Sequence, residues 1–338
     1  MNTKINVRSP FYLHFADTSL KKVVVNLYVS SGANAGATIR YSLSKEEINN
    51  NNFVVFEIAE LIRDYIETEF NGLYANQPVW VDVQYVIQDA NLLNYISDTD
   101  TYLAFDGFGY LWEGENPGLS TTKLISNSVV WKPADQDVRI PFFVEGVSSV
   151  VAGSTTTFTD DGNTNQKIRY ITVGTGVSTV TANLVGGGTE VITIEEMDCS
   201  KYDPIKLTFY NRYGALQDLF FFAKNRKSIS GESTQYKSNS LLTNYAGVDL
   251  GGLKHQYQQI DRNGRERMIL STGFVSEEYN EPIKELILSE KVWITVGSRI
   301  IPVNVTTSDV RFRTSLNDKM VEYDIEVEYA FDAVQNVR

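Results

Sequence analysis

Short stretches rich in β-branched and aromatic residues recur along the chain and constrain its fold more than any other feature. Four of them also alternate in part between apolar and polar residues, at 20–31, 77–88, 167–173 and 190–197. Val, Ile, Tyr and Thr favour extended backbone, and a period of two residues places alternate side chains on opposite faces of a sheet. The sequence therefore predicts a mainly β protein of β-sandwich or barrel domains.

Two segments break this pattern and predict short amphipathic helices. The first lies near residues 57–70, where apolar residues from Ile58 to Ile66 follow the i, i+3, i+4, i+7, i+8 spacing of one helix face. The second lies near residues 281–290, where Pro282 suits a first helical turn and a shorter apolar stripe follows. Because the first helix has one apolar face, that face must pack on a sheet.

The segment 201–228 predicts a β-hairpin. Apolar and polar residues alternate over 205–210, turn residues follow, and Gly214 is able to adopt a positive φ there. The return strand ends in three consecutive phenylalanines, which cannot share one face of a sheet, so this strand is expected to be covered on both faces. Such a hairpin belongs to the core of its domain, with its turn near a subunit contact. The candidate contact residues are Asn211, Arg212, Tyr213, Gly214 and Phe221.

Chain length and local amino-acid composition predict the domain organisation. A chain of 338 residues corresponds to about two domains of roughly 150 residues each. The segment 144–198 is dense in Gly, Thr, Ser and Val, with turn signals at 161–163 and 186–188. We therefore expect an N-terminal β-rich domain at 1–143, a small Gly/Thr-rich β insertion at 144–198 and a C-terminal β-rich domain at 199–338.

Charge is distributed unevenly along the chain. The net charge is −12, with 17 acids and 10 bases in residues 1–143 but 18 of each in residues 199–338. Binding nucleic acid requires clustered Lys and Arg, so sequence-specific nucleic-acid binding is not expected. The single cysteine, Cys199, rules out an internal disulfide and fits a reducing cytosol. The first residues do not resemble a signal peptide and no apolar run reaches roughly 20 residues, so membrane insertion is not expected either.

The sequence offers few residues or motifs that are typical of catalytic sites. With two histidines, His14 and His255, and one cysteine, zinc sites and Cys-His arrangements are hard to build. Neither a G-x-S-x-G elbow nor a Walker motif occurs, and Thr179 stands where a dinucleotide fingerprint starting at Gly174 needs its third glycine. The sequence therefore predicts no catalytic residues, no cofactor and no enzyme activity.

Charged pairs have structural interpretations. Asp98 and Asp100 are spaced like the start of a calcium loop, but the later ligands and the glycine are missing. A solvated loop is the better interpretation, and no metal site is expected. Short basic clusters occur at 224–227 and 262–267. We interpret these clusters as hairpin ends or as salt-bridging residues at a subunit contact.

Several of these segments resemble virion structural proteins of tailed bacteriophages, of the tail or baseplate type. The resemblance lies in the run KYDPIKLTFYNRYGALQDLFFF with IEEMDCS before it, in RSPFYLHF, VVFEIAELIRDYIE and VWVDVQYV, and in the ending KMVEYDIEVEYAFD. It implies a β-rich subunit that assembles into a symmetric ring or tube around the DNA path. In such a ring an acidic lumen would let DNA slide by electrostatic repulsion.

We therefore expect a non-enzymatic structural protein of the phage tail or baseplate, located in the virion and made in the host cytoplasm. Its expected partners are copies of itself, in a symmetric homo-oligomer such as a trimer or hexamer, and other virion tail proteins. The alternative is a receptor- or carbohydrate-binding β-sandwich module, in which exposed aromatic side chains form a platform for sugars. The candidate glycan contacts are Tyr110, Trp112 and Trp131.

Overall fold

The computed structural model describes residues 3–31, 38–48, 51–66, 69–116, 122–160, 162, 166–198, 201–238, 241–244, 247–250, 255–312 and 320–334. Predicted features on Cys199, on residues 161 and 163 and on residues 67–68 lie outside this description. Strands account for 53% of the chain and helical segments for 8%, which confirms the predicted mainly β class. Among the described residues there are two α-helices, α1 (Ala59–Arg63) and α2 (Asn280–Leu288).

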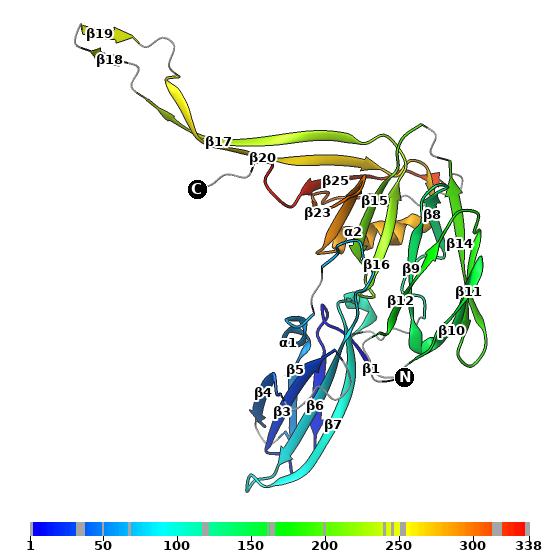
Figure 1. Cartoon of the computed structure of the whole chain (residues 1–338). Helices are drawn as coiled ribbons and strands as arrows, with labels where there is room; N and C mark the ends of the chain where they lie inside the picture. The colour runs from blue at the N-terminus through cyan, green and yellow to red at the C-terminus, as the bar shows by residue number, and fades with distance from the viewer. Residues whose placement is uncertain are drawn as a thin grey trace.

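The first part of the chain folds as two packed sheets, drawn in blue and cyan in Figure 1. The larger sheet has the order β1 (Thr3–Asn6), β7 (Asn94–Phe105), β6 (Val79–Gln88), β3 (Lys22–Ser30) and β4 (Tyr41–Glu46). The smaller sheet pairs β2 (Tyr12–Ala16) with β5 (Phe53–Glu57). Every second residue of β3 is buried, which is the period of a strand with one face on a core. We call this part the N-terminal sandwich.

Helix α1 is shorter than the spacing of its apolar residues predicts. It spans Ala59–Arg63 instead of 57–70, although Ile62 is buried and packs in the core of the N-terminal sandwich as expected. Beyond the helix, the Tyr65 ring packs edge-on against Tyr41 of β4, with 5.9 Å between the ring centroids. The described apolar residues directly after the helix are thus partly buried against the sheet from a turn, without a second helical turn.

The middle part of the chain forms a second five-stranded sheet and a two-stranded ribbon, drawn in green in Figure 1. The sheet has the order β11 (Ser154–Thr157), β10 (Val147–Ala152), β13 (Thr179–Leu184), β14 (Thr189–Met197) and β8 (Val129–Pro133), and the ribbon pairs β9 (Val138–Phe143) with β12 (Ile168–Val173). Strands β8 and β9 precede residue 144, yet they pair with β14 and β12. The middle sheets therefore begin before the expected boundary at 144, because they recruit strands from the preceding segment.

The last part of the chain forms a seven-stranded sheet. Its order is β16 (Leu216–Phe221), β15 (Ile205–Tyr210), β22 (Val292–Val296), β23 (Arg299–Val305), β25 (Asp324–Tyr329), β20 (Tyr257–Ser271) and β17 (Arg226–Lys237). Two small pairs join β21 (Val275–Ser276) to β24 (Met320–Val321) and β18 (Leu241–Asn244) to β19 (Gly247–Leu250). Apolar residues of the seven-stranded sheet, of α2 and of the middle sheets form one continuous cluster, which we call the shared core.

Helix α2 lies close to the predicted second helix. Pro282 is in its first turn, and Ile283 and Leu286 are buried in the shared core. The helix ends before Ser289, whose backbone is extended. Among the described residues, short 3-10 helices occur at η1 (Leu111–Glu113), η2 (Val144–Gly146) and η3 (Glu277–Tyr279).

The hairpin predicted within 201–228 is confirmed as β15 and β16. Gly214 in its turn has a φ of 70°, which is the left-handed region that favours glycine. The rings of Phe220 and Phe222 stack with 6.3 Å between their centroids, and Phe221 is only 1% exposed. All three rings belong to the shared core, so the chain itself covers both faces of β16.

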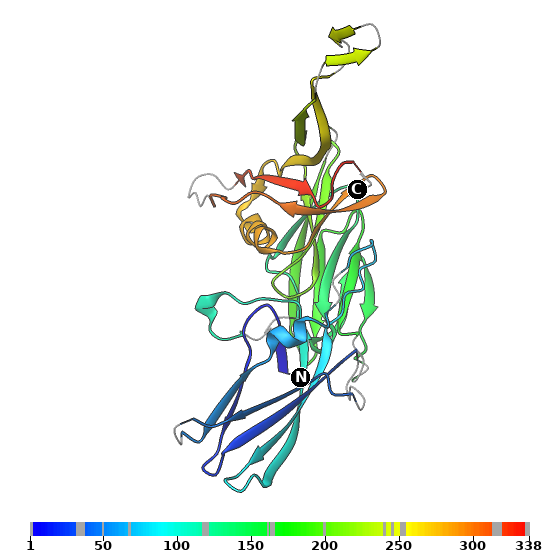
Figure 2. The same ribbon diagram turned by 90° about the vertical axis from the view of Figure 1, so that its left-hand side faces the viewer.

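Strands β17 and β20 leave the sheet as a long two-stranded projection that ends in β18 and β19 (Figure 1). We call these four strands the arm. Figure 2 shows the arm at one end of the molecule and the N-terminal sandwich at the other. The inner residues of β20, 267–271, pair with β25, and 267–269 of these also pair with β17, whereas the outer residues of β20 pair only with β17 among the described strands.

Candidate subunit interface

The arm has little cover from the rest of the chain. All twelve residues of β17 are exposed, whereas β16 at the opposite edge of the same sheet is buried throughout. A two-stranded hairpin is marginally stable in water on its own, because it buries little apolar surface. The arm therefore gains little stability from the rest of its own chain.

Among the arm residues whose side chains the structure describes, four large apolar side chains are exposed. The exposed fractions are 65% for Ile229, 45% for Tyr236, 59% for Tyr257 and 66% for Ile260. Ile260 lies at a register shift in the ladder, where β20 has one residue more than β17. Large apolar side chains of this kind are enriched at protein interfaces, where they gain free energy by leaving water.

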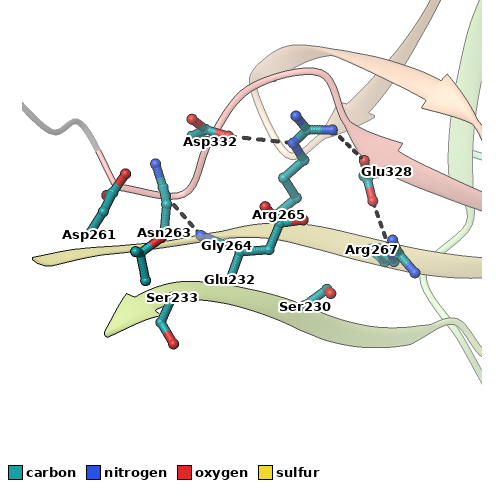
Figure 3. Close-up of a pocket in the computed structure, with 11 residues that line it drawn as sticks. Ser230, Glu232, Ser233, Asp261, Asn263, Gly264, Arg265, Arg267, Glu328 and Asp332 are labelled. Atoms are coloured by element: carbon teal, nitrogen blue, oxygen red, sulfur yellow. Dashed lines mark hydrogen bonds and ion pairs between the residues drawn. The ribbon is translucent and has the colours of Figure 1, made fainter. Parts of the chain in front are cut away.

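Ion pairs fix the base of the arm to the sheet, as Figure 3 shows. Glu328 of β25 lies 3.1 Å from Arg265 Nη1 and 2.7 Å from Arg267 Nε, and Asp332 lies 3.4 Å from Arg265 Nε. We call these four residues the basal clasp. Hydrogen bonds from Arg267 and Arg265 lower the pKa of Glu328, which keeps its carboxylate charged. The basic residues at 265 and 267 thus pair within the chain.

A polar groove of about 540 Å³ lies beside the basal clasp. Hydroxyl, amide and charged groups of both signs line it, including Ser230, Glu232 and Asn263 (Figure 3). Neither a histidine nor a cysteine is among the described residues that line it, and the carboxylates of the clasp already bind its arginines. The groove therefore adjoins the ion pairs that join the arm to the sheet.

A pair of glycines lies near the outer end of the joint between the arm and the sheet. Gly231 and Gly264 face each other across the arm, and a Cβ at Gly264 would lie 2.8 Å from the Ser230 carbonyl oxygen, which is too close for a side chain at that position. The Gly264 carbonyl also accepts the N–H of Ala333 at 2.7 Å. One residue further out, the Asn263 side chain exchanges hydrogen bonds with the backbone of Val334. The segment after β25 therefore anchors β20 as far as residue 263.

The turn predicted as a subunit contact is an internal junction. Asn211 is fully buried, and its side-chain amide donates a hydrogen bond to the Leu124 carbonyl at 2.6 Å. The Phe108 N–H donates to the Arg212 carbonyl at 2.8 Å, and a Cβ at Gly107 would lie 2.5 Å from the same oxygen. The turn therefore fits closely against the segment that follows β7, in the same chain.

The five candidate contact residues consequently differ in their exposure at the surface. Asn211, Gly214 and Phe221 are buried inside the chain and have no free surface, which corrects their assignment as contact residues. Their burial comes from long-range packing that the local pattern does not report. Arg212 and Tyr213 are partly exposed, so a subunit contact at this turn stays a prediction for these two residues.

Two of the three candidate glycan contacts lie together at η1. The rings of Tyr110 and Trp112 stack, with 4.5 Å between the centroids and 10° between the planes. The Lys284 ammonium lies 3.7 Å from the Tyr110 centroid, and Arg212 pairs with Glu113 at 2.5 Å. Trp112 is 74% exposed although these contacts hold its neighbours in place. The result is a fixed indole able to stack on a sugar ring or on an apolar protein side chain.

Trp131 does not join this aromatic pair. It lies on β8, partly buried against the shared core, with its indole N–H buried and without a hydrogen-bond partner. Together with Arg139 and Asp218 it borders a cleft of about 10 Å³, which is too small for a sugar ring. The described residues that line this cleft include neither Tyr110 nor Trp112, so the three residues do not form one glycan site.

A buried carboxylate joins helix α2 to the hairpin turn. Glu285 is fully buried, and it accepts hydrogen bonds from the Ser126 hydroxyl and, at 3.4 Å, from the Arg212 N–H. Burial raises the pKa of Glu285 from 4.5 to about 7. The charge state of this group therefore affects the packing of three segments that lie far apart in the sequence.

Other residues singled out in the sequence have structural positions. His14 is exposed on β2, 3.8 Å from the Glu115 carboxylate, and His255 is exposed before β20. Asp98 and Asp100 lie within strand β7 and not in a loop, because β7 continues through them as the partner of β6. In the part of the chain that the structure describes, no group of three or more His, Cys, Asp or Glu is placed to hold a metal ion.

Comparisons with protein-family models and with curated proteins give no match. The chain matches no known protein family, and it matches no curated protein. Within the described ranges, no helix has the length and apolar character needed to cross a membrane. The function is therefore inferred from the arm, from the surface residues and from the resemblance of the strand and turn segments.

Proposed function

We propose that this chain is a structural subunit of a tailed-bacteriophage tail or baseplate, and that it assembles with copies of itself into a symmetric ring. The observation that carries the proposal is the arm, whose strand β17 is exposed along its whole length. The resemblance of the strand and turn segments to tail and baseplate proteins supports the setting, which is the virion, with other tail proteins as further partners.

The arm supports assembly for an energetic reason. Fixing the backbone of one residue costs roughly 1–2 kcal/mol of conformational entropy, and an exposed strand recovers little of this through burial. Contact with a neighbour adds backbone hydrogen bonds and removes side chains such as Ile229 and Tyr236 from water. In a closed ring every copy both gives and receives this contact. The role is mechanical and includes no catalytic step, cofactor or metal.

Mass and particle shape in solution test the proposal. Light scattering of the purified full chain over a range of concentrations should give a discrete multiple of the monomer mass, and electron microscopy should show rings of three, six or twelve copies. A compact monomer at the highest soluble concentration would contradict the proposal.

A shortened variant is the matched control for the arm. Residues 232–263 are replaced by Asn-Gly, which closes a two-residue hairpin turn between Gly231 and Gly264 because these glycines already face each other. The basal clasp remains, so the variant should keep the thermal stability of the body and remain monomeric. If it assembles as well as the full chain, the arm is not the assembly device.

Carbohydrate binding is the second candidate function, favoured by the exposed indole of Trp112 beside Tyr110. Trp112→Ala should abolish saturable binding of the isolated protein to bacterial surface polysaccharide. Leu111→Ala is the matched control, because Leu111 is 96% exposed on the same 3-10 helix but has no ring to stack on a sugar. Equal binding by both variants would exclude the aromatic pair as the glycan site.

A further inference from the structure

We propose that the arm of one copy docks along the free edge of strand β7 in a neighbouring copy, by adding β17 to that edge as an extra strand. This inference rests on the proposed function, since it names the surface that receives the arm. Three observations support it. They are an open sheet edge, opposite charges on the two strands, and the positions of the two strands at opposite ends of the molecule.

The first half of β7 is an open sheet edge. Strand β6 pairs with β7 from Asn94 to Ala104, but β1 covers the other side only from Tyr102 to Phe105. Of the strands in the described part of the chain, none pairs with residues 94–101 on that side. An open edge presents backbone N–H and C=O groups that form the template for strand addition.

Two exposed acidic side chains lie on the open part of β7. The Asp98 carboxylate accepts the N–H of Thr99 at 2.8 Å, so this side chain lies against the backbone of the strand. Asp98 and Asp100 are both exposed. Two β7 edges would place these like charges against each other, which disfavours pairing between identical edges. The edge is therefore suited to a basic strand.

The arm supplies the complementary charge. Residues 64–122, which include β6 and β7, contain ten acids and neither Lys nor Arg. Residues 226–271, which include the arm, contain seven Lys and Arg and four acids, although Arg265 and Arg267 pair with acids of the body. On β17 itself, three exposed bases stand against one acid. Two of these bases lie at the inner end of β17, and Lys237 lies at its outer end, so Lys237 is the base that the outer half of β17 brings to the edge.

Position and length fit an intermolecular contact. The arm and the N-terminal sandwich lie at opposite ends of the molecule in both views, so a chain does not reach its own β7 edge with its arm (Figures 1 and 2). At about 3.3 Å per residue, β17 is about 40 Å long and the free edge at 94–101 is about 26 Å long. Docking of one surface on a different surface is heterologous, and it gives a ring when the rotation closes.

Strand β4 offers a useful contrast. It is the other edge of the same sheet, and its exposed residues include both Lys45 and Glu46. The charge that favours a basic strand at β7 is therefore missing at β4. Positions on β4 serve as controls for docking at β7.

Charge exchange tests the docking. Asp98→Lys with Asp100→Lys, or Lys237→Glu, should each raise the concentration needed for assembly by about threefold or more. All three changes in one chain restore opposite charges and should restore assembly. Persistence of the defect in the triple variant would overturn the proposal. Circular dichroism checks folding, which we expect to be unchanged because all three side chains are exposed.

Disulfide trapping tests the contact directly. In a Cys199→Ser background the chain has no native thiol. One sample contains Gln235→Cys, two residues from Lys237 on β17, and the other contains Thr99→Cys, or alternatively Ser97→Cys or Thr101→Cys, on β7. Mixed and oxidised, they should give an intermolecular disulfide for at least one β7 position. Ser44→Cys on β4 is the control and should give none.

The outcomes distinguish this inference from the proposed function. If the shortened-arm variant is monomeric while charge exchange has no effect and trapping succeeds at β4 and not at β7, the docking site is wrong and arm-dependent assembly stands. If the full chain never assembles, both proposals fail. Trapping at β7 together with charge rescue supports both.

Discussion

The seven-stranded sheet ends in a hairpin at each edge, and the two hairpins are opposites. Strand β16 of the first is buried throughout, whereas β17 of the second is exposed throughout. The first hairpin is covered by the shared core, and the second is held by its ladder and the basal clasp. An edge position alone therefore does not decide whether a hairpin is covered by its own chain. The apolar side chains of β16 and the polar side chains of β17 decide it.

Phe221→Ser should break the buried hairpin and have the largest effect. Phe221 is 1% exposed in the shared core, and removing such a ring costs about 4 kcal/mol of unfolding free energy. Urea unfolding of the shortened-arm monomer measures this loss without contributions from assembly. A variant with unchanged unfolding free energy would show that the second face of β16 is not a core contact.

Glu285→Gln should change how the stability of the protein depends on pH, because Glu285 accepts a hydrogen bond from Arg212 in the turn of this hairpin. Because burial raises the pKa of Glu285 from 4.5 to about 7, the folded state holds a proton that the unfolded state releases between these values. Stability contributed by this group therefore falls as the pH rises through that window, by about 3 kcal/mol.

The measurement for Glu285→Gln is the difference in unfolding free energy between variant and wild type at pH 4 and pH 8. The glutamine has no charge to desolvate, so the variant should gain relative to wild type as the pH rises. A difference that does not change with pH would contradict the buried, titrating carboxylate.

Glu328→Gln should loosen the exposed hairpin at its base and have a smaller effect. The arginines lower the pKa of Glu328, so the clasp contributes stability above the unfolded pKa of a glutamate and loses it as the pH falls through the lowered value. Amide hydrogen exchange at neutral pH should become faster in residues 267–271 of β20 and stay unchanged in β16. Equal exchange in variant and wild type would mean that the ladder alone anchors the arm.

Ile229→Ser is the matched counterpart of Phe221→Ser and should have the smallest effect on the monomer. Ile229 is 65% exposed, so the unfolding free energy should change by less than about 0.5 kcal/mol. Assembly should nevertheless weaken, because a partner would bury this side chain. A large loss of monomer stability would show that the arm packs on its own chain.

The buried hairpin could be predicted from sequence because its signals are local. Alternation over 205–210, the turn with Gly214 and the run of phenylalanines specify strands, turn and two-sided burial, and Pro282 marks α2 equally well. The role of the turn was not predictable in this way. Its fit against Gly107 depends on a segment about a hundred residues earlier.

The arm is the main feature that sequence patterns missed. The side chains of residues 226–237 point alternately to the two faces of the strand. Both faces carry polar residues, because serine, threonine, glutamine and charged residues occupy each of them. A strand without an apolar face gives no periodic signal. The basic clusters at 224–227 and 262–267 indicated only that a hairpin end lay nearby. The recruitment of β8 and β9 by the middle sheets was missed because pairing between distant segments has no local mark.

The position of β25 in the seven-stranded sheet has a consequence for the order of folding. It lies between β23 and β20, and Ser271 pairs with Asp324, so the arm is joined to the body by a strand more than fifty residues further along the chain. Because a chain is synthesised from its N-terminus, β20 and β17 lack this link to the rest of the sheet until residues 324–329 have been made. The direction of the arm is therefore fixed only after the other strands of the sheet are present.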